Sequence, residues 1–537
     1  MIRRVLSSIF ILLIALSLFQ CARRGRPSGG PRDETPPVLV KAEPPNESIE
    51  FSGQSFKLYF DEYVQLKNID QQLIVSPPLK YQVEISPSLR ASKAIEVIIA
   101  DTLQENTTYA FNFGQSIEDY NEGNPLPFFR YVFSTGSVLD SLSLKGTVKD
   151  AFMPEPESFI SVMLYRRDSS YTDSAVYKKP PSYITSTMDS LKVFELKNLR
   201  AGTYEVIALK DHNNNNLFDP LVDQIGFLDQ PVELPKDSFV SLKTFFEHPA
   251  FSLAFPKLES NNRISMGYFG TPEEIELNSL NKLNEEAEFR LLREGDKDTL
   301  NYWFKNLKAD SLLLKVEEKA SGFIDTLTIK LRAMDSDSLV LKSLSQKNKE
   351  LTDPFFINAT TPLEEVDPTK ISIIDKDTLN IDFDAQINTI KNQLVLDFEK
   401  QLENRYSIYL LPGAVQDFYQ NTNDSLNYSL SVKKLEYYGT LNLLLTRLTE
   451  KPIIIELLSE DLKLQRRLVH PKENNLRFEY LEPMTYYIRV ILDADNNGKW
   501  DPGAYLTKRK AELVFYYQEL IDVRSNWDIQ QDLQLPF

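Results

Sequence analysis

The feature that most constrains the fold is a long succession of short segments in which apolar and polar residues alternate. In the run FKLYFDEYV, Phe56, Leu58 and Phe60 fall on one face of an extended chain, which is the period of a half-buried strand. Pro, Asn, Asp or Gly bounds each run, as expected at turns. No long segment has helical apolar spacing, although residues 271–287 favour short helices. We therefore predict an all-β chain of tandem β-sandwiches.

The length of 537 residues predicts several modules, because single cores rarely grow beyond about 250 to 300 residues. Hydrophobic residues make up 42% of the chain, which is enough material for several buried cores. The net charge of −17 argues against nucleic acid as a partner, because binding to phosphates depends on Lys and Arg.

The N-terminus has the pattern of an export signal. MIRR is a short cationic segment, and the apolar run after it is too short for an ordinary membrane span. Residues 1–20 are therefore predicted to be a signal peptide. Cys21, the only cysteine, follows in LSLFQC, which resembles a bacterial lipobox. We predict lipidation of Cys21 and anchoring to a membrane, the alternative being a free thiol beside an ordinary cleavage site.

The chain contains an internal duplication. ENTTYAFNFGQSIEDYN at 105–121 aligns with ENRYSIYLLPGAVQDFY at 403–419, and the pair Gly146-Thr147 recurs as Gly439-Thr440. The segment 194–220 then aligns with 478–502. Because the order of these landmarks is kept, we predict that a two-domain unit was copied around an unrelated middle segment.

The start of the mature chain resembles a known group of proteins. CARRGRPSGGPRDETPPVL, AEPPNESIEF, FKLYFDEYV and YVFSTG resemble outer-membrane lipoproteins of the Bacteroidota that carry an SbsA-type Ig-like domain. The segments after Gly146 and Gly439 resemble transthyretin-like or carboxypeptidase-regulatory-like β-sandwiches. The resemblance implies a non-enzymatic scaffold or docking subunit of an outer-membrane complex, with a β-barrel, for example of the β-barrel assembly machinery, as the partner.

The resemblance and the duplication together divide the chain. The expected parts are a signal peptide (1–20), a lipid-anchored linker (21–37), an Ig-like domain (38–138), a transthyretin-like β-sandwich (139–238), a middle β-rich domain (239–350), a second Ig-like domain (351–434) and a second transthyretin-like β-sandwich (435–537). We expect the cell surface as the location, with the periplasmic face as the alternative.

Two loops at equivalent points of the duplication have a ligand spacing similar to that of an EF-hand. In the second loop, which begins at Asp493, the expected calcium ligands are Asp493, Asp495, Asn497, the carbonyl of Lys499, and Asp501. In the first loop, which begins at Asp211, they are Asp211, Asn213, Asn215 and Asp219. The twelfth place, where an EF-hand has Glu, holds Ala504 and Val222. The alternative is an Asx-rich hairpin that satisfies its own backbone without metal.

A recurrent tripeptide of Asp, Ser or Thr, and a small apolar residue resembles the O-glycosylation acceptor of exported Bacteroidota proteins. The candidate acceptors are Thr102, Ser141, Ser174, Ser190, Thr299, Ser311, Thr326, Ser338, Thr378 and Ser425. The alternative is local, because Asp-Ser opens a turn and Leu begins the next strand.

The sequence offers little for catalysis, and we predict no catalytic residue. The chain has three histidines, His212, His248 and His470, far apart in sequence, and no motif of a metalloprotease, serine hydrolase or nucleotide-binding protein. An enzyme would need converging carboxylates in a cleft. A second rival function is a glycan-binding or adhesive surface protein, in which exposed tryptophans such as Trp303, Trp500 and Trp527 stack on sugars.

Overall fold

The computed structural model describes residues 33–536 except 188–191, 249, 295–296, 344–350, 352 and 447–450. The chain divides into two compact units. The first unit extends to Ser143 and includes Tyr183–Thr185 and Lys197–Arg200, and the second holds the remainder. The predicted signal peptide and Cys21 lie outside the described residues, so lipidation stays a prediction. Within the described part, no helix is long and apolar enough to span a membrane.

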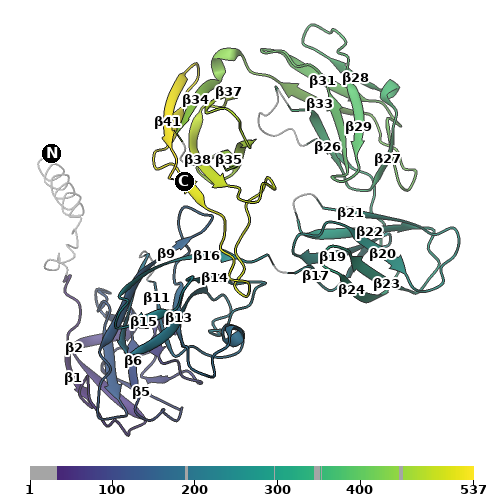
Figure 1. Ribbon diagram of the computed structural model, residues 1–537. Coiled ribbons are helices and arrows are strands. Elements are labelled where there is room, and N and C mark those ends of the chain that lie inside the picture. Colours follow the sequence, from purple (N-terminus) through teal and green to yellow (C-terminus); the bar gives the residue numbers. More distant parts are fainter. Residues whose placement is uncertain are drawn as a thin grey trace, which may run out of the picture. The chain divides into compact units, whose positions relative to one another are not determined.

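The first module of the chain packs two main sheets around an aromatic core (Figure 1). Its elements are β1 (Leu39–Glu43), β2 (Ser55–Leu66), α2 (Ile69–Gln72), β3 (Ile74–Ser76), β4 (Glu84–Ser86), β5 (Ser92–Ile98), β6 (Thr108–Asn112), β7 (Ile117–Asp119) and β8 (Arg130–Ser134). The sheets have the orders β1-β2-β5-β4, with β7 beside β2, and β3-β6-β8. Phe56, Leu58 and Phe60 are buried, which confirms the predicted face of β2. Phe56 stacks on Tyr131 at 3.9 Å between ring centroids.

The second module forms one curved eight-stranded sheet. Its elements are β9 (Leu142–Asp150), β10 (Ser161–Arg166), the 3₁₀ turn η1 (Asp173–Tyr177), β11 (Tyr183–Ser186), β12 (Val193–Leu199), β13 (Gly202–Lys210), β14 (Gln224–Phe227), β15 (Val232–Leu234) and β16 (Phe239–Phe246). The strand order is β11-β10-β13-β14-β16-β9-β12, with β15 beside β13. β16 and β9 pair in parallel.

The middle module has two sheets and corrects one expectation. Its strands are β17 (Ser252–Leu253), β18 (Lys257–Ser260), β19 (Arg263–Phe269), β20 (Ile275–Ser279), β21 (Glu288–Arg293), β22 (Thr299–Lys305), β23 (Ser311–Glu318) and β24 (Phe323–Lys330). The orders are β17-β19-β22-β21, with β18 beside β19, and β20-β23-β24. The expectation of short helices at 271–287 is wrong, because β20 pairs along its whole length with β23. Tertiary pairing overrides a weak local helix preference here.

The fourth module repeats the sheets of the first. Its elements are β25 (Leu341–Ser343), β26 (Phe355–Ala359), β27 (Leu363–Val366), η2 (Pro368–Lys370), β28 (Ile371–Ile374), β29 (Asp384–Asn388), β30 (Gln393–Asp397), β31 (Arg405–Leu410), β32 (Val415–Asp417) and β33 (Leu426–Ser431). The orders β25-β26-β30-β29 and β28-β31-β33 correspond to those of the first module. The aligned Asp119 and Asp417 are both buried and both accept backbone N–H groups of the following turn.

The fifth module repeats the second. Its elements are η3 (Leu435–Tyr437), β34 (Gly439–Thr446), β35 (Ile453–Leu458), β36 (Leu464–Val469), β37 (Asn475–Leu481), β38 (Met484–Leu492), β39 (Val514–Tyr516), β40 (Ile521–Val523) and β41 (Asp528–Gln534). β34 pairs in parallel with β41, as β9 does with β16. At both Gly146 and Gly439 an added Cβ would lie 2.4 Å from a neighbouring atom. Close packing therefore accounts for the repeated glycine.

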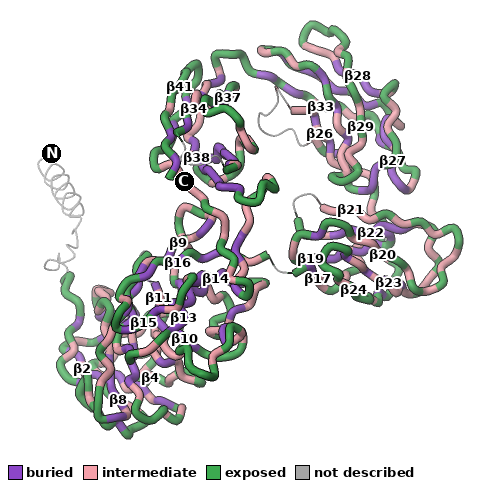
Figure 2. The backbone as a smooth tube through the Cα atoms, in the orientation of Figure 1, coloured by how far each residue is buried: buried purple, intermediate pink, exposed green. Residues whose placement is uncertain are grey.

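These observations confirm the predicted fold class, an all-β chain of tandem β-sandwiches with a partial duplication. Buried and exposed positions alternate along the strands (Figure 2). Separate apolar cores lie within residues 42–133, 264–329, 341–432 and 441–535. The exact domain boundaries of the sequence analysis stay predictions.

Candidate metal centre

The second loop leaves β38 at Asp493, whose side chain is fully buried. One carboxylate oxygen, Oδ1, accepts the N–H of Asn497 at 3.1 Å. The other, Oδ2, accepts the N–H of Gly498 at 2.7 Å and lies 2.5 Å from His470 Nε2. Gly498 occupies the left-handed region at φ +76°, where glycine carries no steric penalty. Backbone N–H groups of the same loop therefore hold the Asp493 carboxylate in place.

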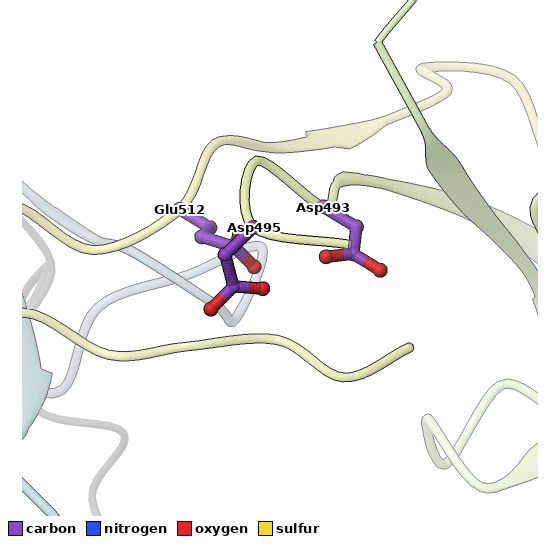
Figure 3. A group of neighbouring side chains, drawn as sticks. All are labelled: Asp493, Asp495 and Glu512. Atoms are coloured by element: carbon purple, nitrogen blue, oxygen red, sulfur yellow. The ribbon is translucent and has the colours of Figure 1, made fainter. Parts of the chain in front are cut away.

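Two further carboxylates converge with Asp493. One oxygen each from Asp493, Asp495 and Glu512 lies within 4.8 Å of the others (Figure 3). Asp493 is buried, Glu512 is half-buried and Asp495 is exposed, so the group opens to solvent on one side. Glu512 lies two residues before β39 and accepts the N–H groups of Ala494 at 2.6 Å and Asp501 at 3.1 Å. It closes the loop from a distant position in the sequence.

The carboxylates of this group have opposite pKa shifts. Burial acts to raise the pKa of Asp493, but hydrogen bonds from His470 and from the amides of Gly498 and Asn497 outweigh it and lower that pKa. Burial raises the pKa of Glu512, and the neighbouring charges of Asp493 and Asp501 raise it further. Repulsion between carboxylates is the condition that a bound cation relieves.

The donor set fits a hard cation. Ca²⁺ takes carboxylate and carbonyl oxygens at about 2.3–2.6 Å, so oxygens that share one ion lie no more than about 5 Å apart, as these three do. The predicted ligands Asp493 and Asp495 belong to the group. Asn497 instead donates from Nδ2 to the carboxylates of Asp495 and Asp501. The backbone N–H of Lys499 donates to Asn497 Oδ1.

The first loop has the same framework without the same acidic group. Asp211 Oδ2 accepts the N–H of Asn216 at 2.6 Å, and Asp211 Oδ1 is buried with no hydrogen-bond partner. Asn215 and Asp219 accept the N–H groups two residues further on, of Leu217 and Leu221. Asn213 is exposed. Over the described ranges, a group of three converging acids occurs at the second loop, so the first loop fits the metal-free alternative better.

Asp223 in the first loop corresponds to Glu512 in the second. The buried carboxylate of Asp223 accepts the N–H groups of His212 and Asp219, each at 2.9 Å. These are the second and ninth places of the loop, the same places that Glu512 serves. Burial and the charge of Asp211 raise the pKa of Asp223. Neither the twelfth-place Val222 nor Ala504 has this role.

EF-hand spacing does not predict Glu512, because this residue lies beyond the twelfth place of the loop. Asp223 stands directly before β14, and Glu512 stands two residues before the equivalent β39. A carboxylate just before the next strand in both copies was the available signal. Seven more residues separate Glu512 from Asp493 than separate Asp223 from Asp211, and that insertion hid the correspondence.

The candidate glycosylation sites divide by exposure. The exposed hydroxyl residues are Thr102, Ser141, Thr326, Ser338, Thr378 and Ser425, and the half-buried ones are Ser174, Thr299 and Ser311. Ser190 lies outside the described residues. Strands begin at, or directly after, Ser141, Thr299, Ser311 and Ser425, which agrees with the local alternative at these four sites. Modification of the exposed sites stays a prediction.

The tryptophans suggested for sugar binding and the histidines considered for catalysis do not form a common site among the described residues. Trp303 is buried at 3% exposure and Trp527 is exposed at 52%. Trp500 is half-buried, and its Nε1 donates to the Glu512 carbonyl at 3.2 Å. His212 is exposed and lies 3.8 Å from Glu157 and 3.7 Å from Asp223. Trp303, with its buried face, cannot stack on a sugar in this fold.

An open polar pocket of about 620 Å³ lies where the middle and fourth modules meet. Its lining includes Asn261, Lys305, Asp310, Arg332 and Tyr419. The Tyr419 hydroxyl donates to backbone carbonyls of the middle module, so it holds the two modules together.

Comparisons with known proteins assign one segment. A family model of the bacterial Ig-like domain matches residues 33–135, and a search of curated proteins finds no match. Similar solved structures include the Bacillus anthracis TIE protein (9% identity, TM-score 0.15, 95% of this chain and 76% of that one). They also include the S-layer protein rSbsC(31-844) (11%, 0.17, 91% and 67%) and the major pilin subunit BcpA of Bacillus cereus (11%, 0.13, 73% and 99%). Residues 33–135 of this chain are a bacterial Ig-like domain.

Proposed function

We propose that this chain is a non-enzymatic protein of a bacterial cell surface, in which tandem β-sandwiches serve as a structural or adhesive element. The observation that carries the proposal is a bacterial Ig-like domain followed by four further β modules with buried apolar residues. The acids that converge, Asp493 and Glu512, are bound to backbone N–H groups, which suits a structural role more than proton transfer.

Three further features would support this role at the cell surface. Acylation of Cys21 would hold the modules at the outer membrane, because a multiply acylated cysteine binds bilayers durably. A structural Ca²⁺ at Asp493, Asp495 and Glu512 would offset the repulsion among these carboxylates and stiffen the second loop. O-glycans on the exposed Ser and Thr sites would add to the solvated surface.

Surface proteolysis tests the main proposal. In intact cells, added trypsin should cleave the protein, and radiolabelled palmitate should enter it through Cys21. The variant Cys21→Ser should lose the label and leave the membrane fraction. Protection from trypsin until the outer membrane is permeabilised would contradict the surface location.

A docking role at an outer-membrane β-barrel is the second candidate, and one observation favours it. β36 lies at the end of the strand order β36-β35-β38-β39, and its Leu464 and Val469 are exposed. Sheet edges of this kind accept a strand from a partner. A pull-down from gently solubilised membranes should recover a barrel protein in fixed ratio, and Leu464→Lys with Val469→Lys should abolish it. Recovery that is unchanged by these substitutions would remove β36 from the docking role.

A further inference from the structure

The second loop, which is seven residues longer than the first, contains a small hairpin that packs on the second module. Residues 503–510 make up this docking hairpin. Ala504 and Arg509 exchange backbone hydrogen bonds of 2.8 and 3.0 Å, and Lys508 N–H donates to the Tyr505 carbonyl at 3.0 Å. Glu512 closes the base of the hairpin by accepting the N–H of Asp501. The first loop, which lacks the insertion, has no equivalent segment in the sequence.

Tyr505, at the start of the hairpin turn, is buried by aromatic side chains of the second module. Tyr505 is 1% exposed, its hydroxyl lies 3.2 Å from that of Tyr171, and its ring meets Phe227 edge-on at 5.4 Å between centroids. The N–H of Tyr505 donates to the half-buried Glu247. A Cβ at Gly503 would lie 2.3 Å from Phe245 Cζ and 2.7 Å from the Arg509 carbonyl oxygen. The contact is as close as one within a single core.

Charge complementarity adds to this apolar contact. Lys508 Nζ lies 3.0 Å from the buried Glu205 and 3.1 Å from Asp173, and 3.8 Å from the centre of the Tyr505 ring. Lys510 Nζ donates to the Phe227 carbonyl, lies 3.3 Å from Asp229, and sits 4.1 Å from the Phe227 ring centre. Among these pairs, Lys508–Glu205 has a buried carboxylate, and such a pair is costly to break from one side.

We propose that the docking hairpin is an intramolecular lock that joins the two copies of the transthyretin-like sandwich into one rigid body. Modules joined only by linkers move relative to each other by default. Here an insertion in one copy fills an acidic and aromatic surface of the other. The insertion thus gives the fifth module a segment that binds the second module of the same chain.

Distance measurement between spin labels tests the lock. Cys21→Ser removes the only cysteine of the full chain, and labels at Lys236→Cys and Lys463→Cys, both highly exposed, report on the two copies. The distance distribution should be single and narrow. Gly503→Ala should add a broad population, whereas Gly53→Ala, whose Cβ meets nothing closer than 3.4 Å, should not.

A charge series keeps the test decisive if Gly503→Ala fails to fold. Lys508→Glu should raise the ratio of undocked to docked chains by about tenfold. Adding Glu205→Lys to the same chain should partly restore docking. The exposed Lys472→Glu serves as the matched control. A narrow, unchanged distribution in a folded Lys508→Glu chain would overturn the proposal, as would equal broadening in Lys472→Glu.

Discussion

The first and second loops occupy the same point of a duplicated sandwich but end differently. Both fix their first Asp through the N–H of the sixth residue, and both use a later carboxylate to bind the N–H groups of the second and ninth residues. In the first loop this carboxylate is Asp223, twelve residues after Asp211. In the second it is Glu512, nineteen residues after Asp493. The comparison shows that the closing carboxylate is defined by the amides it binds and not by its count along the loop.

The difference in length has two physical consequences. The shorter loop satisfies its own backbone, and its closing Asp223 is fully buried. The longer loop brings Glu512 beside Asp493 and Asp495, where one side stays open to solvent, and it supplies the docking hairpin. One copy is therefore a turn whose backbone N–H groups are bound by its own side chains, and the other combines a candidate cation site with an inter-module contact.

The largest expected difference is between the two first-place aspartates. Asp493→Ala removes the acceptor of the Gly498 N–H, one of the two acceptors of the Asn497 N–H, and the partner of His470. We expect it to destabilise the fifth module by about 2–4 kcal/mol. Asp211→Ala removes one such acceptor from the second module and should cost about 1 kcal/mol. Native-state hydrogen exchange of β38 and β13 in chelator measures each module separately. Equal losses at both sites would break the comparison.

The next effect is the response to calcium. Ca²⁺ at 100 times its dissociation constant should stabilise the fifth module by about 2.7 kcal/mol, and Glu512→Gln should remove most of this gain by withdrawing a charged ligand. Asp223→Asn should leave the gain unchanged. Thermal unfolding with calcium and with chelator checks both variants. A calcium gain that is lost in Asp223→Asn would place the cation in the first loop.

The pH dependence of the fifth module should show both shifts. The pKa of Asp493 is lowered from its ordinary value of 3.8, so its contribution is present above that value and is lost as pH falls through the lowered pKa. The pKa of Glu512 is raised from 4.5, so stability increases as pH falls from neutral through the raised pKa. We expect a maximum near the ordinary carboxyl range in chelator. Asp493→Asn should remove the loss of stability on the acidic side of this maximum. Glu512→Gln should remove the loss of stability as pH rises above the maximum.

The smallest effect concerns the sixth place. Gly498 has φ +76° and its counterpart Asn216 has φ +58°. Gly498→Ala should cost about 1 kcal/mol because a Cβ is strained in this region. Asn216→Ala should cost less, because Asn216 already has a Cβ and already carries part of this strain. Chemical denaturation monitored at each module measures both values, and a stabilising Gly498→Ala would show that the loop has another conformation.

The alternation of apolar and polar residues made the fold predictable. The candidate metal site could not be predicted in full, because Glu512 binds the loop from outside the spacing of its other acidic residues. Alternation placed Phe56 and Leu58 inside, and the duplication aligned Asp119 with Asp417, because these signals are local or repeated. Short helices were wrongly expected at 271–287, because β20 is a strand that pairs with β23, which lies far along the chain. Asp493 and Asp495 followed from loop spacing. Glu512 and the docking hairpin did not, because an insertion shows its role only when the distant surface that it contacts is known.

Calcium stoichiometry is the sharpest test of the proposed cation site at the second loop. Equilibrium dialysis of the full chain against radiolabelled calcium, with Glu512→Gln and Asp223→Asn beside the unaltered protein, counts the sites. We expect one high-affinity ion per chain, retained in Asp223→Asn and lost in Glu512→Gln. Two ions, none, or one that survives Glu512→Gln would contradict it.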